Sequence, residues 1–186
     1  MNFIKTLSII TAATIILSAC GNKPAQTKKY YRLSPSAAVT ASETKPATLV
    51  VKRPKALSIL GGRPIVATKE DGSLVQLSHH FWLESPKVLL QDKLKVWASE
   101  HWQSVSYQVP NDNTHHILDS RILAFEKRQK LAVVSLEFSL YDHENKLLFN
   151  QTYDNEQAIE GEGFKAFTTA LSRSVDAILI QLTADL

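Results

Sequence analysis

The fold of this chain is decided by residues 131–141, which read Leu131-Ala132-Val133-Val134-Ser135-Leu136-Glu137-Phe138-Ser139-Leu140-Tyr141. Apolar side chains alternate there with Ser135, Glu137 and Ser139. A period of two residues is typical of a strand with one buried face and one face in water. We therefore expect an antiparallel strand that is covered on one side only.

The neighbouring segments extend this strand into a sheet. Residues 104–109 and 117–125 are predicted strands, and residues 147–153 follow a polar turn at 142–146 and should pair back on 131–141. The chain closes with a predicted helix over 163–184. Its apolar residues recur at helical spacing and are Phe164, Phe167, Leu171, Val175, Ile178 and Leu182.

The first half of the chain repeats the order of strands followed by a helix. Strands are predicted at residues 30–33, 47–52 and 63–68, and Asp71-Gly72 is a hairpin signal that leads into a returning strand at 74–77. The segments 21–29 and 34–46 are polar or rich in Ser, Ala, Thr and Pro, which is typical of linkers.

Ser85-Pro86 predicts the start of the first helix, with serine as the N-cap and proline at the first helical position. Leu90, Leu94 and Trp97 fall at positions i, i+4 and i+7 and predict its buried stripe. The opposite, exposed face is predicted to hold Lys87, Gln91, Lys95 and Ser99. We expect Trp97 to be core, and Trp82 to be core in preference to a partner-binding anchor.

Hairpin-length connections in both halves favour an antiparallel or mixed sheet that carries its helices on one face. The predicted fold class is therefore α+β, with two main helices packed on one face of the sheet. Residues 30–186 are long enough for one domain and leave little room for a second.

The N-terminus carries the features of a bacterial lipoprotein signal. Lys5 precedes an apolar run at residues 7–16, which is too short to span a membrane, and Leu17-Ser18-Ala19-Cys20 matches a lipobox at all four positions. Residues 1–19 are thus predicted to be removed, and Cys20, the only cysteine, is the predicted lipidation site. Residues 20–29 are the predicted lipidated cysteine and flexible tether.

Lipidation at Cys20 has two consequences. Two or three acyl chains make an effectively permanent membrane anchor. Gly21 follows in place of the aspartate that usually retains a lipoprotein in the inner membrane, which favours the periplasmic face of the outer membrane. With 21 basic and 18 acidic residues, the charge is nearly balanced and does not indicate nucleic-acid binding.

Catalytic patterns are weak in this sequence. It has no free thiol after lipidation, no Gly-x-Ser-x-Gly elbow, no phosphate-cradling loop and no His-Glu-x-x-His. The pairs His79-His80 and His115-His116 could form a zinc site only if the fold joined them, because adjacent histidines on a strand point to opposite faces. We expect exposed histidines in loops or at strand ends, no metal or cofactor, and no enzyme activity.

Asp119 and Arg121 are two residues apart on one predicted strand. They therefore share a face of the sheet. We expect them to form a structural ion pair with each other rather than a catalytic site.

The order of motifs resembles the ABC-type transport auxiliary lipoproteins, in particular PqiC-like members. The resemblance is carried by the lipobox, Tyr31-Arg32-Leu33, Leu49-Val50-Val51, Leu60, Arg63-Pro64-Ile65-Val66, Trp82 before the first helix, Arg121-Ile122-Leu123-Ala124-Phe125-Glu126, the alternating strand at residues 133–140 and the final amphipathic helix. One departure is the turn at residues 142–146, where the family leads us to expect an Asp-x-x-Gly pattern.

This resemblance implies a non-enzymatic docking subunit of a trans-envelope lipid transport system. The implied partners are an MCE-domain (PqiB-like) protein and inner-membrane transport components, together with the membrane through the acyl anchor. Several copies could assemble as a homo-oligomer on a ring-shaped partner, which the sequence leaves open.

Two other functions remain open at this point. One is a lipoprotein activator of a periplasmic cell-wall synthase, which needs a tether that crosses the peptidoglycan; residues 21–46 would reach about 90 Å if extended. The other is an envelope hydrolase or metal-binding lipoprotein, for which the histidine pairs are the only indication.

Overall fold

Three long antiparallel strands form the centre of the structure, a computed structural model that describes residues 26–35, 44–111 and 113–186. They are β7 (His116–Arg128), β8 (Leu131–Tyr141) and β9 (Leu147–Ala158). β8 pairs with both neighbours along its length, so that Leu136 lies between Ile122 and Tyr153. The strand predicted from the alternation at residues 131–141 is therefore confirmed.

The other edge of β7 pairs with three short strands in succession, all parallel to it. β2 (Lys45–Val51) pairs with its beginning, β3 (Lys55–Ala56) with its middle and β4 (Pro64–Thr68) with its end. At about 3.3 Å per residue, the 13 residues of β7 form a strand much longer than any of these partners. The sheet consequently forks at this edge.

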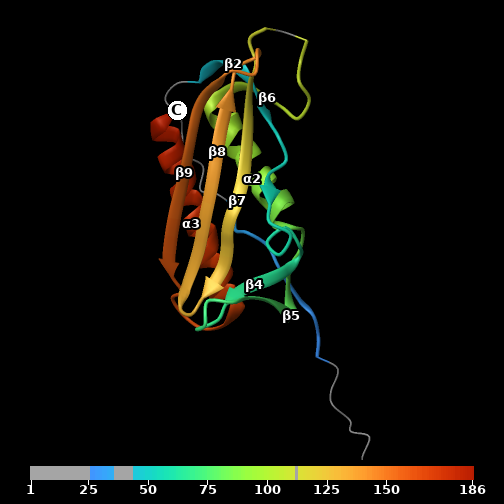
Figure 1. The fold of residues 1–186 in the computed structure, drawn as a ribbon, viewed down its shortest axis with the longest axis vertical. Coiled ribbons are helices and arrows are strands. Elements are labelled where there is room, and N and C mark those ends of the chain that lie inside the picture. Colours follow the sequence, from blue (N-terminus) through green and yellow to red (C-terminus); the bar gives the residue numbers. More distant parts are fainter. Residues whose placement is uncertain (1–25, 36–43, 112) are drawn as a thin grey trace, which may run out of the picture.

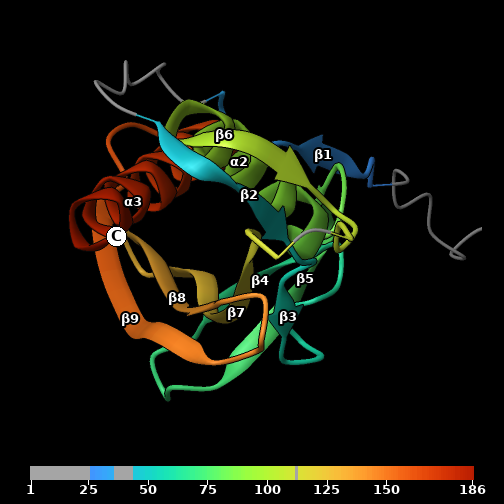
Figure 2. The ribbon, with the colours of Figure 1, turned by 90° about the horizontal axis from the view of Figure 1, so that it is seen from above.

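Each arm of the fork continues outward. β6 (Trp102–Ser106) adds in parallel to β2, whereas β5 (Leu74–Trp82) adds antiparallel to β4 and carries β1 (Lys29–Tyr31) on its outer edge. The result is a mixed sheet that curves around the helices, as Figures 1 and 2 show. The predicted α+β class with an antiparallel or mixed sheet is confirmed.

Two helices fill the concave side of the sheet. α3 (Gly163–Asp185) packs on β8 and β9, and α2 (Pro86–His101) packs on β2 and β6. The α3 residues Phe167, Leu171, Val175, Ile178 and Leu182 are fully buried, and Phe164 is partly buried. This confirms the predicted stripe and the placement of both helices on one face.

The two helices also contact each other. Lys93 Nζ of α2 lies 2.6 Å from Asp176 Oδ1 of α3, and Trp97 Nε1 donates a hydrogen bond of 2.8 Å to Thr183 Oγ1. Leu90 and Leu94 are fully buried between the layers. The predicted stripe of α2 is correct, and both Trp97 and Trp82 are core residues.

The predicted exposed face of α2 is largely wrong. Only Ser99 is exposed, whereas Lys87, Gln91 and Lys95 are half-buried. Gln91 Nε2 donates to the carbonyl of Val51, and the Lys95 ammonium lies 4.0 Å from the ring centroid of Tyr107. Long polar side chains pack their apolar stems on neighbouring strands, which the helical period alone does not reveal.

The N-cap of α2 is Ser85 as predicted, but its hydroxyl makes no capping bond. Ser85 Oγ is buried and has no hydrogen-bond partner among the described residues. Its carbonyl instead accepts from the backbone of Val88 and Leu89. Pro86 at the first helical position sets the start of the helix without help from the serine side chain.

Several strands differ in extent from the prediction because their pairing partners lie far away in the sequence. β5 continues past residue 77 to Trp82, where β1 supplies its partner, and β9 continues to Ala158 along β8. β7 reaches Arg128, whereas β6 begins at Trp102 and ends at Ser106, short of the predicted 109.

The two hairpin turns predicted from the sequence use the chemistry that it indicates. Asp71 Oδ1 accepts hydrogen bonds from Ser73, and Gly72 has a φ of 82°. At the second turn, Asp142 Oδ1 accepts from the backbone of Glu144 and Lys146, and Asn145 has a φ of 63°. Asparagine tolerates this left-handed conformation, so the expected glycine is not required.

Candidate functional site

The N-terminal segment is fixed to the body of the domain at one end of the molecule. Lys29 and Tyr31 of β1 pair with His80 and Trp82 of β5, and the backbone of Ser34 donates a 2.8 Å hydrogen bond to Ser172 Oγ. Leu33 is buried in the core. Residues 29–34 therefore belong to the fold and do not act as free linker.

The predicted lipidation site precedes this attachment by a short distance. Cys20 and residues 21–25 lie outside the described residues, and Lys29 comes nine positions after Cys20. Nine residues span at most about 30 Å. Among the described residues, neither helix is long and apolar enough to cross a membrane.

An aromatic and basic surface lies beside this attachment, formed by Lys28, Tyr30, Arg63 and Phe81. Tyr30 and Phe81 are paired across β1 and β5 with ring centroids 5.8 Å apart. The Lys28 ammonium lies 5.4 Å from the centroid of Phe81, and the Arg63 guanidinium lies 5.2 Å from that of Tyr30. We call these four residues the aromatic–basic surface.

The inner side of β1 packs on α3 through aromatic rings. His80 stacks on Phe164 at 3.6 Å between centroids, and its Nδ1 lies 3.2 Å from the Tyr31 hydroxyl. Burial, followed by repulsion from Lys29 and His79, lowers the pKa of His80. Burial also raises the pKa of Tyr31. His80 is therefore a neutral packing residue.

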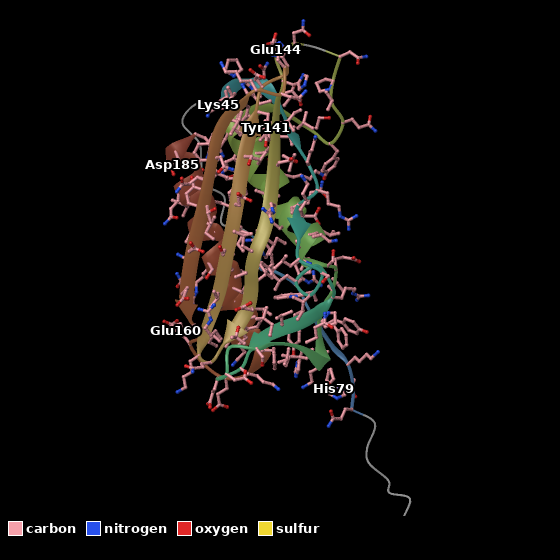
Figure 3. The ribbon with its side chains drawn as sticks, in the orientation of Figure 1. Lys45, His79, Tyr141, Glu144, Glu160 and Asp185 are labelled. Carbon is pink, nitrogen blue, oxygen red and sulfur yellow. The ribbon has the colours of Figure 1, made fainter. Side chains whose placement is uncertain are left out.

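The two histidine pairs lie at opposite ends of the molecule. His79 lies near β1, at one end of the molecule. His115 and His116 lie at the start of β7, next to Ile117. Ile117 pairs with Tyr141, which Figure 3 shows at the other end. Within the described ranges, no group of three or more His, Cys, Asp and Glu side chains is placed to hold a metal.

The expectation that these histidines are exposed is wrong. His115 is buried, and the other three are half-buried. His116 packs against Trp102 at 5.2 Å, and burial is the main cause of its lowered pKa. The rings of His80 and His116 thus pack on aromatic side chains, which a pattern of adjacent polar residues does not show.

The end of the molecule opposite β1, here called the distal end, carries exposed apolar side chains. They come from the segment after β6 and from the start of β9. These two segments lie at the same end of the sheet, because Ser106 and Leu147 belong to one row of paired residues that includes Tyr141. These residues are Tyr107, Val109, Leu147 and Leu148. Leu147 and Leu148 open β9, whereas Tyr107 and Val109 follow the end of β6, so no single period of the sequence indicates them as one surface.

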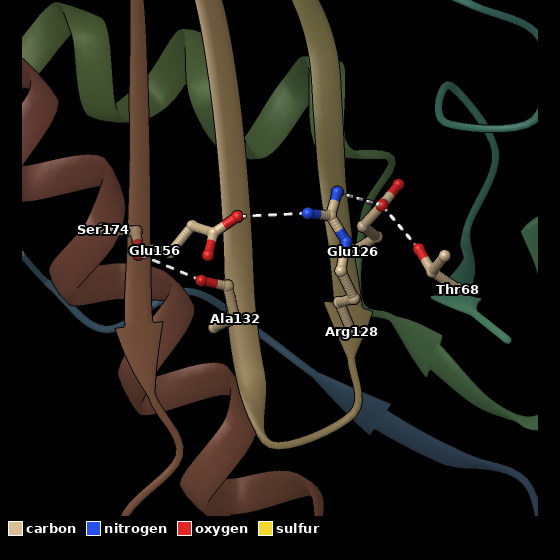
Figure 4. A network of polar contacts seen from close by, with 6 residues as sticks. All are labelled: Thr68, Glu126, Arg128, Ala132, Glu156 and Ser174. Carbon is tan, nitrogen blue, oxygen red and sulfur yellow. Dashed lines mark hydrogen bonds and ion pairs between the residues drawn. The ribbon is translucent and has the colours of Figure 1, made fainter. Parts of the chain in front are cut away.

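The convex face of the sheet carries a polar network, which Figure 4 shows. Thr68 Oγ1 donates a 2.6 Å hydrogen bond to the buried carboxylate of Glu126. Arg128 lies 3.3 Å from Glu126 and 3.1 Å from Glu156, and so joins β7 to β9. A shallow hollow of about 570 Å³ opens beside Glu126. The carboxylate is occupied by these partners, which indicates a structural role.

Asp119 and Arg121 do not pair with each other, so that prediction is wrong. Asp119 Oδ2 lies 3.3 Å from Lys55 Nζ, and Arg121 Nη1 lies 3.2 Å from Glu137 Oε2. Residues on adjacent strands lie closer than residues two positions apart on one strand. The structural, non-catalytic interpretation of both residues is retained.

Two solved structures resemble the fold. One, titled as an uncharacterized protein, has a TM-score of 0.70 at 18% identity and covers 86% of this chain and 98% of its own. The other is protein XCC0632 from Xanthomonas campestris, of family DUF330, with a TM-score of 0.72 at 16% identity, covering 83% of this chain and 91% of its own. At these identities the likeness concerns the fold alone.

No curated protein matches the chain. The family model described as "ABC-type transport auxiliary lipoprotein component" matches residues 31–182, which is most of the sequence. The match begins at Tyr31, the last residue of β1, and ends at Leu182, near the end of α3, so it covers β2 to β9, α2 and most of α3. The chain therefore belongs to the family of ABC-type transport auxiliary lipoproteins.

Proposed function

We propose that this protein is a non-enzymatic docking subunit of a trans-envelope lipid transport system. It is anchored through Cys20 to the periplasmic face of the outer membrane and meets an MCE-domain (PqiB-like) protein, which in turn connects to inner-membrane transport components. Family membership supports a role in ABC-type transport. The lipid, the outer membrane and the MCE partner are the parts that the proposal adds.

The observation that carries this proposal is the separation of the tether from the distal end. β1 holds the start of the domain within about 30 Å of Cys20. The exposed residues Tyr107, Val109, Leu147 and Leu148 lie at the opposite end, near Tyr141, which pairs with Leu147 and is labelled in Figure 3. An anchored subunit thus presents its apolar distal end to the periplasm, where a bridging partner would arrive.

The same geometry counts against a cell-wall synthase activator. That function needs a long tether, and the pairing of β1 with β5 removes residues 29–34 from it. The reach falls from about 90 Å to about 30 Å. A domain held so near its anchor is better suited to a partner that comes to the membrane.

Crosslinking in cells tests the partner directly. A photo-reactive residue in place of Leu148 at the distal end should capture an MCE-domain protein, found in the outer-membrane fraction by mass spectrometry. The same replacement of Leu83, which is similarly exposed but lies next to β1, serves as the control and should not capture it. Capture of a cell-wall synthase at Leu148 would refute the proposal.

The anchor has its own test. Cys20→Ala removes the sulfur that takes up the lipid, so we expect an unprocessed or mislocalised precursor, seen by membrane fractionation and intact-mass measurement. Mature protein that still fractionates with the outer membrane would contradict the assignment of Cys20.

A further inference from the structure

We propose that the aromatic–basic surface rests on the phospholipid headgroups of the leaflet that holds the acyl anchor. This inference depends on acylation of Cys20, which is part of the proposed function. It adds a second, non-covalent contact with the membrane and thereby a fixed orientation of the domain.

The short tether places this surface beside the bilayer. Lys28 is the residue immediately before β1, and Tyr30 is in β1 itself. With Cys20 eight positions before Lys28, at most about 30 Å of extended chain separates the acyl chains from the surface. A tether of this length keeps the local concentration of headgroups around the surface high.

The chemistry of the surface matches a membrane interface. Tyrosine and phenylalanine rings favour the boundary between headgroups and acyl chains. Tyr30 is 50% exposed and can reach such a boundary. Both rings have a cation above them, Lys28 and Arg63, so apolar and positive groups occupy one surface. Anionic lipid phosphates attract such cations.

Neither cation is neutralised by a carboxylate among the residues that the structure describes. Arg63 Nε donates a 3.2 Å hydrogen bond to the carbonyl of Trp82, which fixes the guanidinium beside Tyr30. The other guanidinium nitrogens and the Lys28 ammonium remain available for phosphate oxygens. Guanidinium groups bind phosphate with two hydrogen bonds, which suits this role.

The distal end offers a matched control. Tyr107 is exposed to nearly the same extent as Tyr30, at 47%, and it has a cation over its ring, Lys95 at 4.0 Å from the centroid, as Tyr30 has Arg63 at 5.2 Å. The two tyrosines are thus alike in exposure and in having a cation over the ring, but they lie at opposite ends of the molecule with respect to the tether. Composition alone predicts equal membrane contact for both, whereas the proposal predicts contact for Tyr30 only.

The test is a tryptophan reporter in the full mature lipoprotein. Tyr30→Trp and Tyr107→Trp are each reconstituted in vesicles of phosphatidylethanolamine and phosphatidylglycerol, and intact-mass measurement first verifies the acylation. The native Trp82, Trp97 and Trp102 are buried and give a constant background. Emission and its quenching by lipids with a nitroxide near the headgroup are then measured.

We expect emission from position 30 to shift to shorter wavelength and to be quenched by the nitroxide lipid, and emission from position 107 to do neither. Equal quenching at both positions, or none at position 30 in an acylated protein, would overturn the inference while leaving the proposed function intact. A shift at position 30 that occurs only in native membranes would indicate a protein occupant and would also overturn it. Absence of acylation would instead refute the anchor.

A charge variant tests the role of the cations. Lys28→Glu in the Tyr30→Trp background should reduce the quenching and weaken its dependence on phosphatidylglycerol, whereas Lys28→Arg should preserve both. Lys28 is exposed and lies before the first residue of β1, so folding should be unchanged by circular dichroism. Equal quenching in the Glu and Arg variants would show that the surface does not bind anionic lipid.

Discussion

The two faces of the β7–β8–β9 sheet use the same strands for different purposes. On the concave face, Ala132, Val134, Leu136, Phe138 and Leu140 of β8 are buried under the helices. On the convex face, the same three strands, together with Lys55 of β3, carry the ion pairs Asp119–Lys55, Arg121–Glu137 and Arg128 with Glu126 and Glu156. Apolar burial stabilises the fold strongly, whereas exposed ion pairs each contribute little.

Part of the convex face is nevertheless buried. Val133 and Ser135 of β8 are buried, although alternation predicts that they face water. Val133 lies in register between Glu126 and Glu156, and Arg128 bridges these two carboxylates across it. The two faces therefore differ in how much of their surface is exposed to water. On the convex face, long charged side chains cover part of the central strand β8.

The largest effect should come from a charge placed under the sheet. Leu171→Asp on α3 buries an unpaired carboxylate in the core, so we expect the free energy of unfolding to fall by about 3–5 kcal/mol. Urea unfolding of the mature protein measures this change. The control is Ile180→Asp on the same helix, where the side chain is 60% exposed and the change should stay within about 0.5 kcal/mol. Similar losses in both variants would mean that α3 does not cover the sheet through this stripe.

The next effect concerns the contact between the two helices of the concave layer. Asp176→Asn removes the charge opposite Lys93, whose side chain is only 7% exposed, and should cost about 1–3 kcal/mol. Because a buried ion pair is often replaceable by apolar groups, adding Lys93→Met should recover part of the loss. Unfolding in urea gives both values, and a double variant less stable than Asp176→Asn alone would contradict this account.

The convex face should show smaller effects. Glu126→Gln keeps an acceptor for Thr68 but removes the charge facing Arg128, so we expect a loss of about 1 kcal/mol. Glu137→Gln makes the same change at the more exposed pair with Arg121 and should cost less than about 0.5 kcal/mol. A larger loss at Glu137 than at Glu126 would reverse the ranking that burial predicts.

The smallest effect is a dependence of stability on pH. The pKa of His80 is lowered mainly by burial, so the unfolded chain binds a proton more readily than the fold does. The contribution of this residue is fully present above its ordinary pKa of about 6.5 and declines as the pH falls from there to its folded pKa. His80→Phe keeps the stack on Phe164 and should flatten the urea midpoint between about pH 7 and pH 5. An unchanged slope would show that His80 does not contribute.

The turn carboxylates act in a separate, more acidic range. Hydrogen bonds from the backbone of Lys146 and Glu144 lower the pKa of Asp142, and those from Ser73 lower that of Asp71. Their stabilisation is present above the ordinary aspartate pKa of about 3.9 and is lost below it, as the pH falls through the lowered values. The histidine and aspartate ranges can therefore be separated in one titration.

The sequence by itself predicts the strand at residues 131–141, the two helical stripes, the hairpin turns at residues 71–72 and 142–146, and the family. These follow from local periods and turn chemistry, in which residues near in the chain decide the outcome. The prediction of Cys20 as the lipidation site likewise depends on local sequence and stays a prediction.

Tertiary structure alone decides the fork of the sheet at β7, the cross-strand partners of Asp119 and Arg121, the burial of the histidines and the assembly of the aromatic–basic surface. Lys28 and Tyr30 meet Arg63 and Phe81 only because β1 pairs with β5 across about fifty residues. No local period encodes such a contact, because register between distant strands is set by which faces the whole chain can bury together.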